Sequence, residues 1–273
     1  ALGKSRSLRD LEKLAENAAR MPSAENTFRN LNLNQRVSTD SPFVSIETWK
    51  SCGGEAADLR GMAVYGGLDL SARTDLTAFV LVGRDEAGNA HVRPYFWTPQ
   101  EGLFERAKRD RAPYDLWARQ GFLRTTPGAT VDYGFVVSEI AEIVADIDLQ
   151  AVAFDRWRID IFRQELQRAG INLPMVGHGR GLKDMSPAIA ALEAALLNSK
   201  LRHGMHPVLN MCALNATVLT DPAGNRKFVK QKQTGRIDGM VALAMAMAAT
   251  NKADAPPISS EQLSDFIDNM VVL

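Results

Sequence analysis

The segment Val64–Val82 constrains the fold more than any other part of the chain. It consists of an apolar run typical of a strand, a short polar turn and a second apolar run that returns. Asp69 stands at the end of the first run. An unpaired carboxylate is costly to bury in so apolar a strand, so a bound metal ion is one candidate for its counter-charge. The alternative is an Asp that only caps the backbone of the turn.

The composition is that of an ordinary globular chain without a charge bias. Among 273 residues, 32 basic side chains balance 32 acidic ones, so any nucleic-acid site must come from local clustering. Cys52 and Cys212 form no CxxC pair, which suits a reducing cytoplasm and argues against a disulfide scaffold or a thiolate zinc site. The most apolar run, Met240–Ala249, is too short to span a bilayer. No signal peptide opens the chain, and a start at Ala1 suggests a processed or cut fragment.

Residues 1–60 are predicted to form an arm or linker. Ser7 is placed to cap a helix that ends near Met21 and Pro22. An Asn-rich stretch follows, which we expect to be irregular because such segments make poor cores. Its scattered apolar side chains imply that the arm docks against its own domain or a missing neighbour; they are Phe28, Leu31, Leu33, Phe43, Ile46 and Trp49.

From Met62 onward the pattern predicts an α/β fold. Three strands with short connections, Met62–Leu70, Leu76–Val82 and Ala90–Trp97, form an antiparallel meander. The charged run Glu105–Arg111 is expected to be a solvated loop or short helix. Helices then alternate with short apolar strands, which predicts parallel strands added to the meander's sheet, with helices flanking it. These later elements are a helix near 133–148, the strand Ala151–Asp155, a helix over 159–170, a helix from Ser186 to Asn198, a hairpin around 214–230 and a buried helix from Asp238.

Three carboxylates share one pattern along this order. Asp69 and Asp155 end apolar strands, and Asp238 begins the buried helix. If the two strands are neighbours, the acids meet at one sheet edge, where they raise each other's pKa unless cations neutralise them. Mg²⁺ prefers such oxygen ligands, and two ions about 3.5–4 Å apart can activate water and stabilise a leaving oxygen. Asp75 is a possible outer contributor.

Each acid also has a structural interpretation. Asp155 could pair with Arg156 or Arg158. Asp238 could merely cap its helix, where a negative charge is favourable. The conjunction of the three acids with the strand order favours the metal site.

Short motifs in a fixed order carry a family resemblance. They are Gly67-Leu68-Asp69-Leu70-Ser71, Asp75-Leu76-Thr77-Ala78, Phe96-Trp97-Thr98-Pro99, Thr126-Pro127-Gly128, Ala153-Phe154-Asp155-Arg156-Trp157, His206-Pro207-Val208-Leu209 with Asn215 and Lys230, and Arg236-Ile237-Asp238-Gly239-Met240-Val241-Ala242-Leu243. This set resembles the nuclease half of a tailed-phage terminase large subunit, which has a ribonuclease H-like fold. Phe28–Asn34 resembles the join to the motor half of that family.

The resemblance implies a two-metal endonuclease, using Mg²⁺ or Mn²⁺, that cuts concatemeric double-stranded viral DNA during genome packaging. Asp69, Asp155 and Asp238 carry over as catalytic, metal-binding acids, with Asp75 beside them. The implied partners are the terminase small subunit, the portal protein and the ATPase half of the large subunit, in the host cell cytoplasm and not in the mature virion. The implied division is an arm over 1–60, a nuclease domain over 61–253 and a tail over 254–273.

Two departures qualify the resemblance. Arg156 follows Asp155 where the family tends towards Pro-Trp. No GxxxxGK[ST] phosphate loop occurs in the sequence, so the packaging ATPase is expected to be absent and DNA translocation is not expected.

Basic side chains flank the acids in sequence and are predicted to contact the DNA backbone. Such contacts give affinity without sequence choice. The predicted residues are Arg156, Arg158, Arg180, Lys183, Lys230, Lys232 and Arg236. His203 and His206 have the spacing of a zinc pair but no third ligand nearby, which favours a structural or substrate-facing role.

Two rival functions remain from the sequence. The Gly67–Ser71 motif before a hairpin also resembles the first phosphate loop of sugar kinases and actin-like ATPases, whose later Asp-x-Gly and Gly-Gly motifs are missing here. The other rival is a non-catalytic assembly module that docks the motor on its portal.

Overall fold

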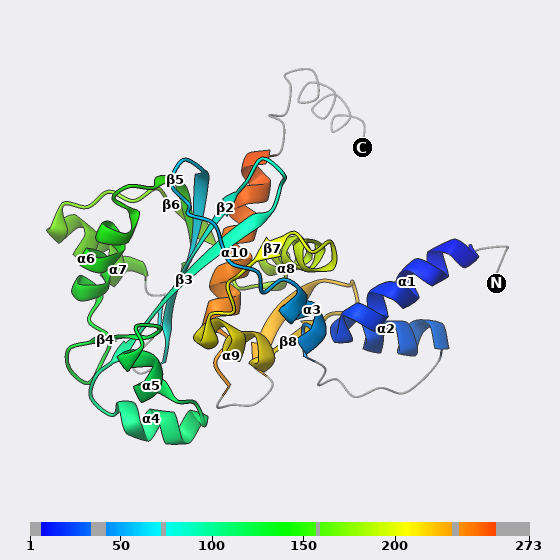
Figure 1. Ribbon diagram of the computed structural model, residues 1–273, viewed down its shortest axis with the longest axis horizontal. Helices are drawn as coiled ribbons and strands as arrows, with labels where there is room; N and C mark the ends of the chain where they lie inside the picture. Colours follow the sequence, from blue (N-terminus) through cyan, green and yellow to red (C-terminus); the bar gives the residue numbers. More distant parts are fainter. Residues whose placement is uncertain (1–6, 34–41, 72–74, 157–158, 231–234, 255–273) are drawn as a thin grey trace, which may run out of the picture.

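One mixed sheet organises the molecule (Figure 1). The computed structural model describes residues 7–33, 42–71, 75–156, 159–230 and 235–254. The strands β1 (Ala63–Asp69), β2 (Thr77–Arg84) and β3 (Ala90–Pro99) form the predicted antiparallel meander. Parallel strands extend it on both sides in the order β4-β3-β2-β1-β5-β6, and β7 also pairs with β3. The added strands are β4 (Arg124–Thr126), β5 (Asp148–Asp155), β6 (Met175–His178) and β7 (Leu201–Arg202). The predicted ribonuclease H-like α/β fold is confirmed.

Helices cover both faces of the sheet, as alternation along β2 requires. Phe79 and Leu81 point into one apolar cluster with α6 (Tyr133–Val144) and α7 (Ile159–Ala169). Val80 and Val82 point into the other, formed with the helices on the opposite face. The helices on this opposite face are α8 (Leu182–Leu197), α9 (Pro207–Asn215) and α10 (Asp238–Asp254). Figure 1 shows α6 and α7 on one side of the strands and α8, α9 and α10 on the other.

The helix α10 lies directly on the central strands because β1 carries glycine there. A Cβ built on Gly67 would lie 1.9 Å from the carbonyl oxygen of Ala242. Any larger residue would therefore push the helix off the sheet. Residues 240–247 of α10 are buried on every side, which confirms the predicted buried helix.

The described parts of the first sixty residues, 7–33 and 42–60, contain more helix than the sequence suggested. The helix α1 (Leu8–Arg20) begins as predicted, with the Ser7 hydroxyl accepting the Asp10 N–H at 3.1 Å. The stretch expected to be irregular forms α2 (Pro22–Leu33), so that prediction was wrong; proline suits a first helical turn. A further helix is α3 (Ile46–Ser51). Phe43 and Trp49 are buried in the same cluster as α8 and α10, so this part of the arm docks against its own domain.

Three other local predictions concern the charged run, the start of the helix near Ser186 and the hairpin around 214–230. The charged run forms α4 (Leu103–Asp110), which α5 (Tyr114–Arg119) follows, and Arg106 is buried there instead of solvated. Arg106 donates to the Glu101 carbonyl at 2.6 Å and also to the Pro99 carbonyl, so main-chain acceptors hold its guanidinium in place. The helix α8 begins four residues before Ser186, with Met185 buried in its first turn. The hairpin of β8 (Ala216–Thr220) and β9 (Arg226–Lys230) is confirmed.

No helix in the described ranges is long and apolar enough to cross a membrane.

Candidate functional site

Two of the predicted acids meet at one edge of the sheet because β1 and β5 are parallel neighbours. Leu68 pairs with Phe154, so the next residues, Asp69 and Asp155, leave the sheet side by side. Gly67 contacts α10, and side chains alternate along a strand, so Asp69 points to the α10 face. The sequence predicted this juxtaposition only if the two strands were adjacent, and they are.

The third acid reaches the same edge through α10. Asp238 is the first residue of α10, one turn before the Ala242 that rests on Gly67. Its side chain lies against the end of β1, where Asp69 and Asp238 are 1% and 8% exposed. The Oδ2 atom of Asp238 is buried without a hydrogen-bond partner among the described residues. A buried carboxylate oxygen left in this state is costly unless a cation approaches it.

The surroundings of Asp69 and Asp238 raise the pKa of both carboxyl groups and so disfavour their charged forms. The pKa of Asp69 is raised to about 8, chiefly by burial; Arg180 acts to lower this pKa, and the neighbouring Asp238 and Asp155 act to raise it. Burial likewise raises the pKa of Asp238. A divalent cation would relieve both effects, because it replaces lost hydration and neutralises mutual repulsion.

Arg180, between β6 and α8, supplies positive charge in the present arrangement. Its guanidinium pairs with Asp69 Oδ1, and its Nε lies 2.8 Å from Asp155 Oδ2. Asp155 therefore pairs with Arg180, which is distant in the sequence. In the part of the chain that the structure describes, no three His, Cys, Asp or Glu side chains are spaced to hold a metal ion. The three predicted ligands lie at one edge of the sheet, but the Arg180 side chain lies between Asp69 and Asp155.

A pocket of about 240 Å³ opens beside these acids. Asp75 lies on its wall with a side chain 41% exposed; Arg236 pairs with Asp75 Oδ1, and Lys230 Nζ lies 3.9 Å from its Oδ2. Asp75 thus connects the acids to basic residues. The charged lining consists of Asp69, Asp75, Arg180, Lys230 and Asp238.

An ionic network that the sequence did not reveal supports this wall. The side chains of Arg236 and Asp110 are 6% and 2% exposed, and Arg236 Nε lies 2.8 Å from Asp110 Oδ2. The Tyr114 hydroxyl donates to the same carboxylate at 2.9 Å. Arg236 therefore joins α4 and α5 to Asp75 and to the start of α10. No local signal distinguishes Asp110 within its charged run, because its partner is 126 residues away.

The other predicted DNA-binding residues that the structure describes, Arg156 and Lys183, are more exposed than Arg236. Arg156 is exposed, and a Cβ on Gly177 of β6 would lie 3.1 Å from its Nε. Lys183 is exposed in the first turn of α8. Arg158 and Lys232 lie outside the described residues. DNA contacts by these residues, and by the buried Arg236, remain predictions.

The two histidines do not form a zinc pair. His203 stacks on Trp49 with ring centroids 3.9 Å apart, and a ring nitrogen lies 2.9 Å from the Trp49 carbonyl. His203 is therefore structural. His206 packs against Phe96 and Phe122 with centroid distances of 5.4 and 5.2 Å, at another pocket.

Known proteins resemble this chain over nearly all of its length. A family model described as the terminase large subunit, endonuclease domain, matches residues 1–254. The large terminase subunit of Enterobacteria phage HK97 is 58% identical over 98% of this chain and 52% of its own length. The protein YmfN of Escherichia coli K12 is 26% identical over 94% of this chain and 58% of its own length.

A solved structure agrees with these sequence matches. The crystal structure of the HK97 large terminase superimposes with a TM-score of 0.74 and 59% identity, over 91% of this chain and 52% of that one. This chain thus spans about half the length of the relatives it matches. The sheet, the strand-end acids and these matches agree, and the chain belongs to the endonuclease-domain family of terminase large subunits.

Proposed function

We propose that the chain is a metal-dependent endonuclease that cuts concatemeric double-stranded viral DNA during genome packaging. The observation that carries this proposal is the convergence of Asp69, Asp155 and Asp238 at one sheet edge, beside a pocket open to solvent. Membership of a nuclease-domain family supports the reaction class and removes the sugar-kinase-like alternative.

The donor set fits a hard divalent cation. Asp69, Asp155 and Asp238 offer carboxylate oxygens, and Oδ2 of Asp238 is buried and unpartnered among the described residues. Burial also raises the pKa of Asp69 and of Asp238, which disfavours their charged forms without a counter-ion. These three residues would hold two Mg²⁺ or Mn²⁺ ions. When bound, such ions activate a water molecule and stabilise the leaving oxygen of a phosphodiester.

The surrounding residues have separate roles in this proposal. Arg180 is 46% exposed and reaches the acids from a loop, so it can turn to a DNA phosphate when a metal ion neutralises Asp69 and Asp155. Lys230 lies on the pocket wall and offers a second phosphate contact. Asp75 is a helper of the metal site, oriented by Arg236. Arg156, Arg158, Lys183, Lys232 and Arg236 complete the proposed DNA-binding set.

The wider setting follows from the family. We propose that the nuclease domain occupies residues 61–253, with the arm of 1–60 leading from the ATPase half and the tail of 254–273 following it. The small subunit, the portal protein and the ATPase half are the proposed partners, in the host cell cytoplasm.

Plasmid nicking with Mg²⁺ or Mn²⁺ tests the proposal. Asp69→Asn, Asp155→Asn and Asp238→Asn should each lower the rate at least about a hundredfold, because each ligand supports several kcal/mol of transition-state stabilisation. Asp160→Asn, an exposed acid of α7, is the matched control and should keep the wild-type rate. Unchanged nicking in all three variants would reject the mechanism.

One observation favours a second candidate, a non-catalytic module that docks the motor on its portal. Arg180 already pairs with Asp69 and Asp155, as a permanent structural counter-ion would. A wild type that cuts with neither metal, and that binds no Mn²⁺ by calorimetry, would select this candidate.

A further inference from the structure

The outer edge of β3 is paired at its two ends and open in its middle. Ala90 and His91 pair with β7, and Trp97–Pro99 pair with β4. Between them, the five residues Val92–Phe96 have a strand partner only on the β2 side, within the described part of the chain. We call the space beside Val92–Phe96 the β3 notch. Five residues of strand span about 17 Å.

Main-chain groups point into the β3 notch. On this outer edge the Ala90 N–H donates a hydrogen bond to the Lys200 carbonyl at 2.7 Å, and the Gln100 N–H donates one to the Thr126 carbonyl at 2.9 Å. Successive residues of a strand direct their main-chain groups to opposite edges. The even-numbered residues between them, Val92, Pro94 and Phe96, therefore face the notch. Pro94 lacks an N–H, which limits pairing to a short segment and protects the edge from longer strands.

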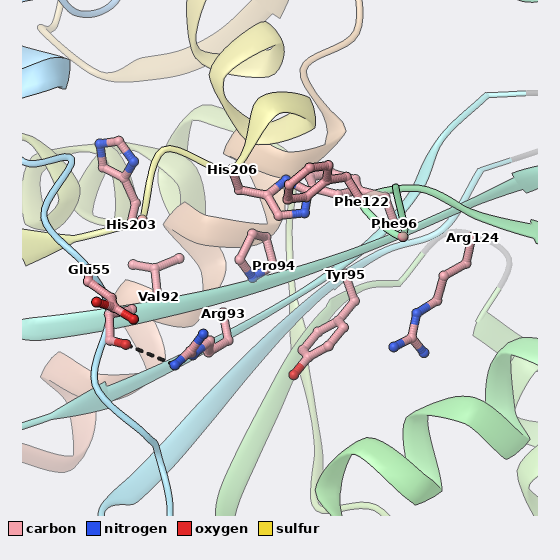
Figure 2. A pocket seen from close by; sticks show the side chains of 13 residues that line it. Glu55, Val92, Arg93, Pro94, Tyr95, Phe96, Phe122, Arg124, His203 and His206 are labelled. Carbon is pink, nitrogen blue, oxygen red and sulfur yellow. Dashed lines mark hydrogen bonds between the residues drawn. The ribbon is translucent and has the colours of Figure 1, made fainter. Parts of the chain in front are cut away.

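A pocket of about 370 Å³ occupies the β3 notch, and its two sides differ (Figure 2). On one side the ring of Tyr95 lies between Arg93 and Arg124. The Arg124 guanidinium is 5.3 Å from the Tyr95 ring centroid, and Arg93 donates to the Ala56 carbonyl at 2.8 Å. This side therefore presents two cations.

The opposite side of the β3 notch is aromatic. Phe96, Phe122 and His206 gather there, and the Phe122 side chain is 38% exposed (Figure 2). The Nδ1 atom of His206 is buried without a hydrogen-bond partner among the described residues. An aromatic or aliphatic side chain would fit this side.

We propose that the β3 notch binds a short extended peptide segment of a partner protein by strand addition. The peptide's backbone pairs with β3, an acidic side chain lies between Arg93 and Arg124, and its sequence neighbours, aromatic or aliphatic, contact Phe122 and His206. Alternation along an extended chain places the acidic and apolar side chains on the two matching sides.

The carboxylates nearby favour a peptide over nucleic acid. Glu55 lines the pocket, and Glu139 Oε2 lies 3.3 Å from Arg124 Nη1. A nucleic-acid strand would bring a phosphate with every nucleotide close to these acids, whereas a peptide needs only one acidic group. Nucleic acid would also leave the β3 main chain without a backbone partner.

Fluorescence polarisation of the full chain with a labelled, capped hexapeptide, acetyl-Ser-Asp-Phe-Asp-Phe-Ser-amide, tests the proposal. Arg93→Ala and Arg124→Ala should each weaken binding about tenfold, since each removes a charge-assisted hydrogen bond. Glu55→Gln should tighten binding, because it removes a repelling carboxylate. Arg168→Ala, an exposed arginine of α7, is the control and should bind as the wild type does.

Two further measurements separate strand addition from simple charge attraction. N-methylation of one alternate set of peptide amides should abolish binding, and N-methylation of the other set should not. Hydrogen exchange at the Val92 and Phe96 amides should slow on binding. No binding at millimolar peptide, equal tolerance of both N-methyl sets, or displacement by single-stranded oligothymidine would overturn the proposal.

Discussion

The side chains of Asp69 and Asp110 are exposed to the same small extent, yet their surroundings shift the two pKa values in opposite directions. Each side chain is 2% exposed. Asp110 accepts hydrogen bonds from Arg109, Arg236 and Tyr114, which outweigh its burial and lower its pKa. Asp69 has one side-chain donor among the described residues, Arg180, and burial raises its pKa. The donors around Asp110 and the neighbouring acids Asp155 and Asp238 beside Asp69 distinguish the two carboxylates.

The difference shows what each carboxylate is suited to do. A carboxylate with several donors is stable as a charge and fixes the elements around it. A buried carboxylate with few donors gains most from an added cation, and a perturbed pKa in an open pocket is typical of functional sites. We therefore propose that Asp110 is a structural acid and Asp69 a metal-binding acid.

The largest expected effect is a difference in the free energy of unfolding between the Asp110→Asn and Asp69→Asn variants. Asp110→Asn should lower the free energy of unfolding by about 3 kcal/mol, because it leaves the buried guanidinium of Arg236 without its main counter-charge. Asp69→Asn should change it by less than about 1 kcal/mol or raise it, since a neutral amide is easier to bury. Urea unfolding in EDTA, followed by tryptophan fluorescence, measures both. Equal losses would remove the distinction.

The pH dependence of stability should also follow the acid with the raised pKa. The pKa of Asp69 is raised to about 8 by burial, against about 4 in an unfolded chain. Between these values the folded chain holds a proton that the unfolded chain has lost, so stability falls as pH rises, by up to about 1.4 kcal/mol per unit. Thermal unfolding in EDTA from pH 5 to pH 8 measures this. Asp69→Asn should flatten the profile, and a wild type that gains stability over this range would contradict the assignment.

Changing Arg180 tests whether Asp69 is poised for a cation. Arg180→Gln removes the charge that competes for Asp69 and Asp155, so Mn²⁺ affinity should rise about tenfold by calorimetry. Arg168→Gln is the control, since Arg168 is exposed on α7. Unchanged or weaker affinity would show that Arg180 does not occupy the cation's place.

The smallest effect on stability is expected at Asp75. Its side chain is 41% exposed, so Asp75→Asn should change the free energy of unfolding by no more than about 0.5 kcal/mol. Nicking should nevertheless fall about tenfold, as is usual for residues that support metal ligands. Nicking at the wild-type rate would make Asp75 only a turn residue.

Several features could be predicted from the sequence because they depend on local pattern. Apolar periodicity located the three strands of the meander and the buried helix after Asp238. Acids at strand ends and at a helix start then indicated the candidate site, since few chains place carboxylates in such apolar surroundings. The capping position of Ser7 also correctly predicted the start of α1.

Other features were beyond the sequence because they depend on distant partners. The burial of Asp110 and Arg106 inside a charged run follows from partners brought together by folding, as does the Arg180 contact with Asp69, 111 residues away. The β3 notch exists only because β4 and β7 pair with the two ends of one strand.

The acid at the end of β1 shows where the division lies. Its sequence context indicated that Asp69 would be buried and that its charge would need compensation, because strand periodicity and the cost of a buried charge are local properties; the structure confirms the burial. Tertiary structure alone decided which groups surround it: parallel pairing brought Asp155, the contact of α10 with Gly67 brought Asp238, and a loop brought Arg180. Pairing and packing are set by contacts across the whole chain, and no local pattern contains them.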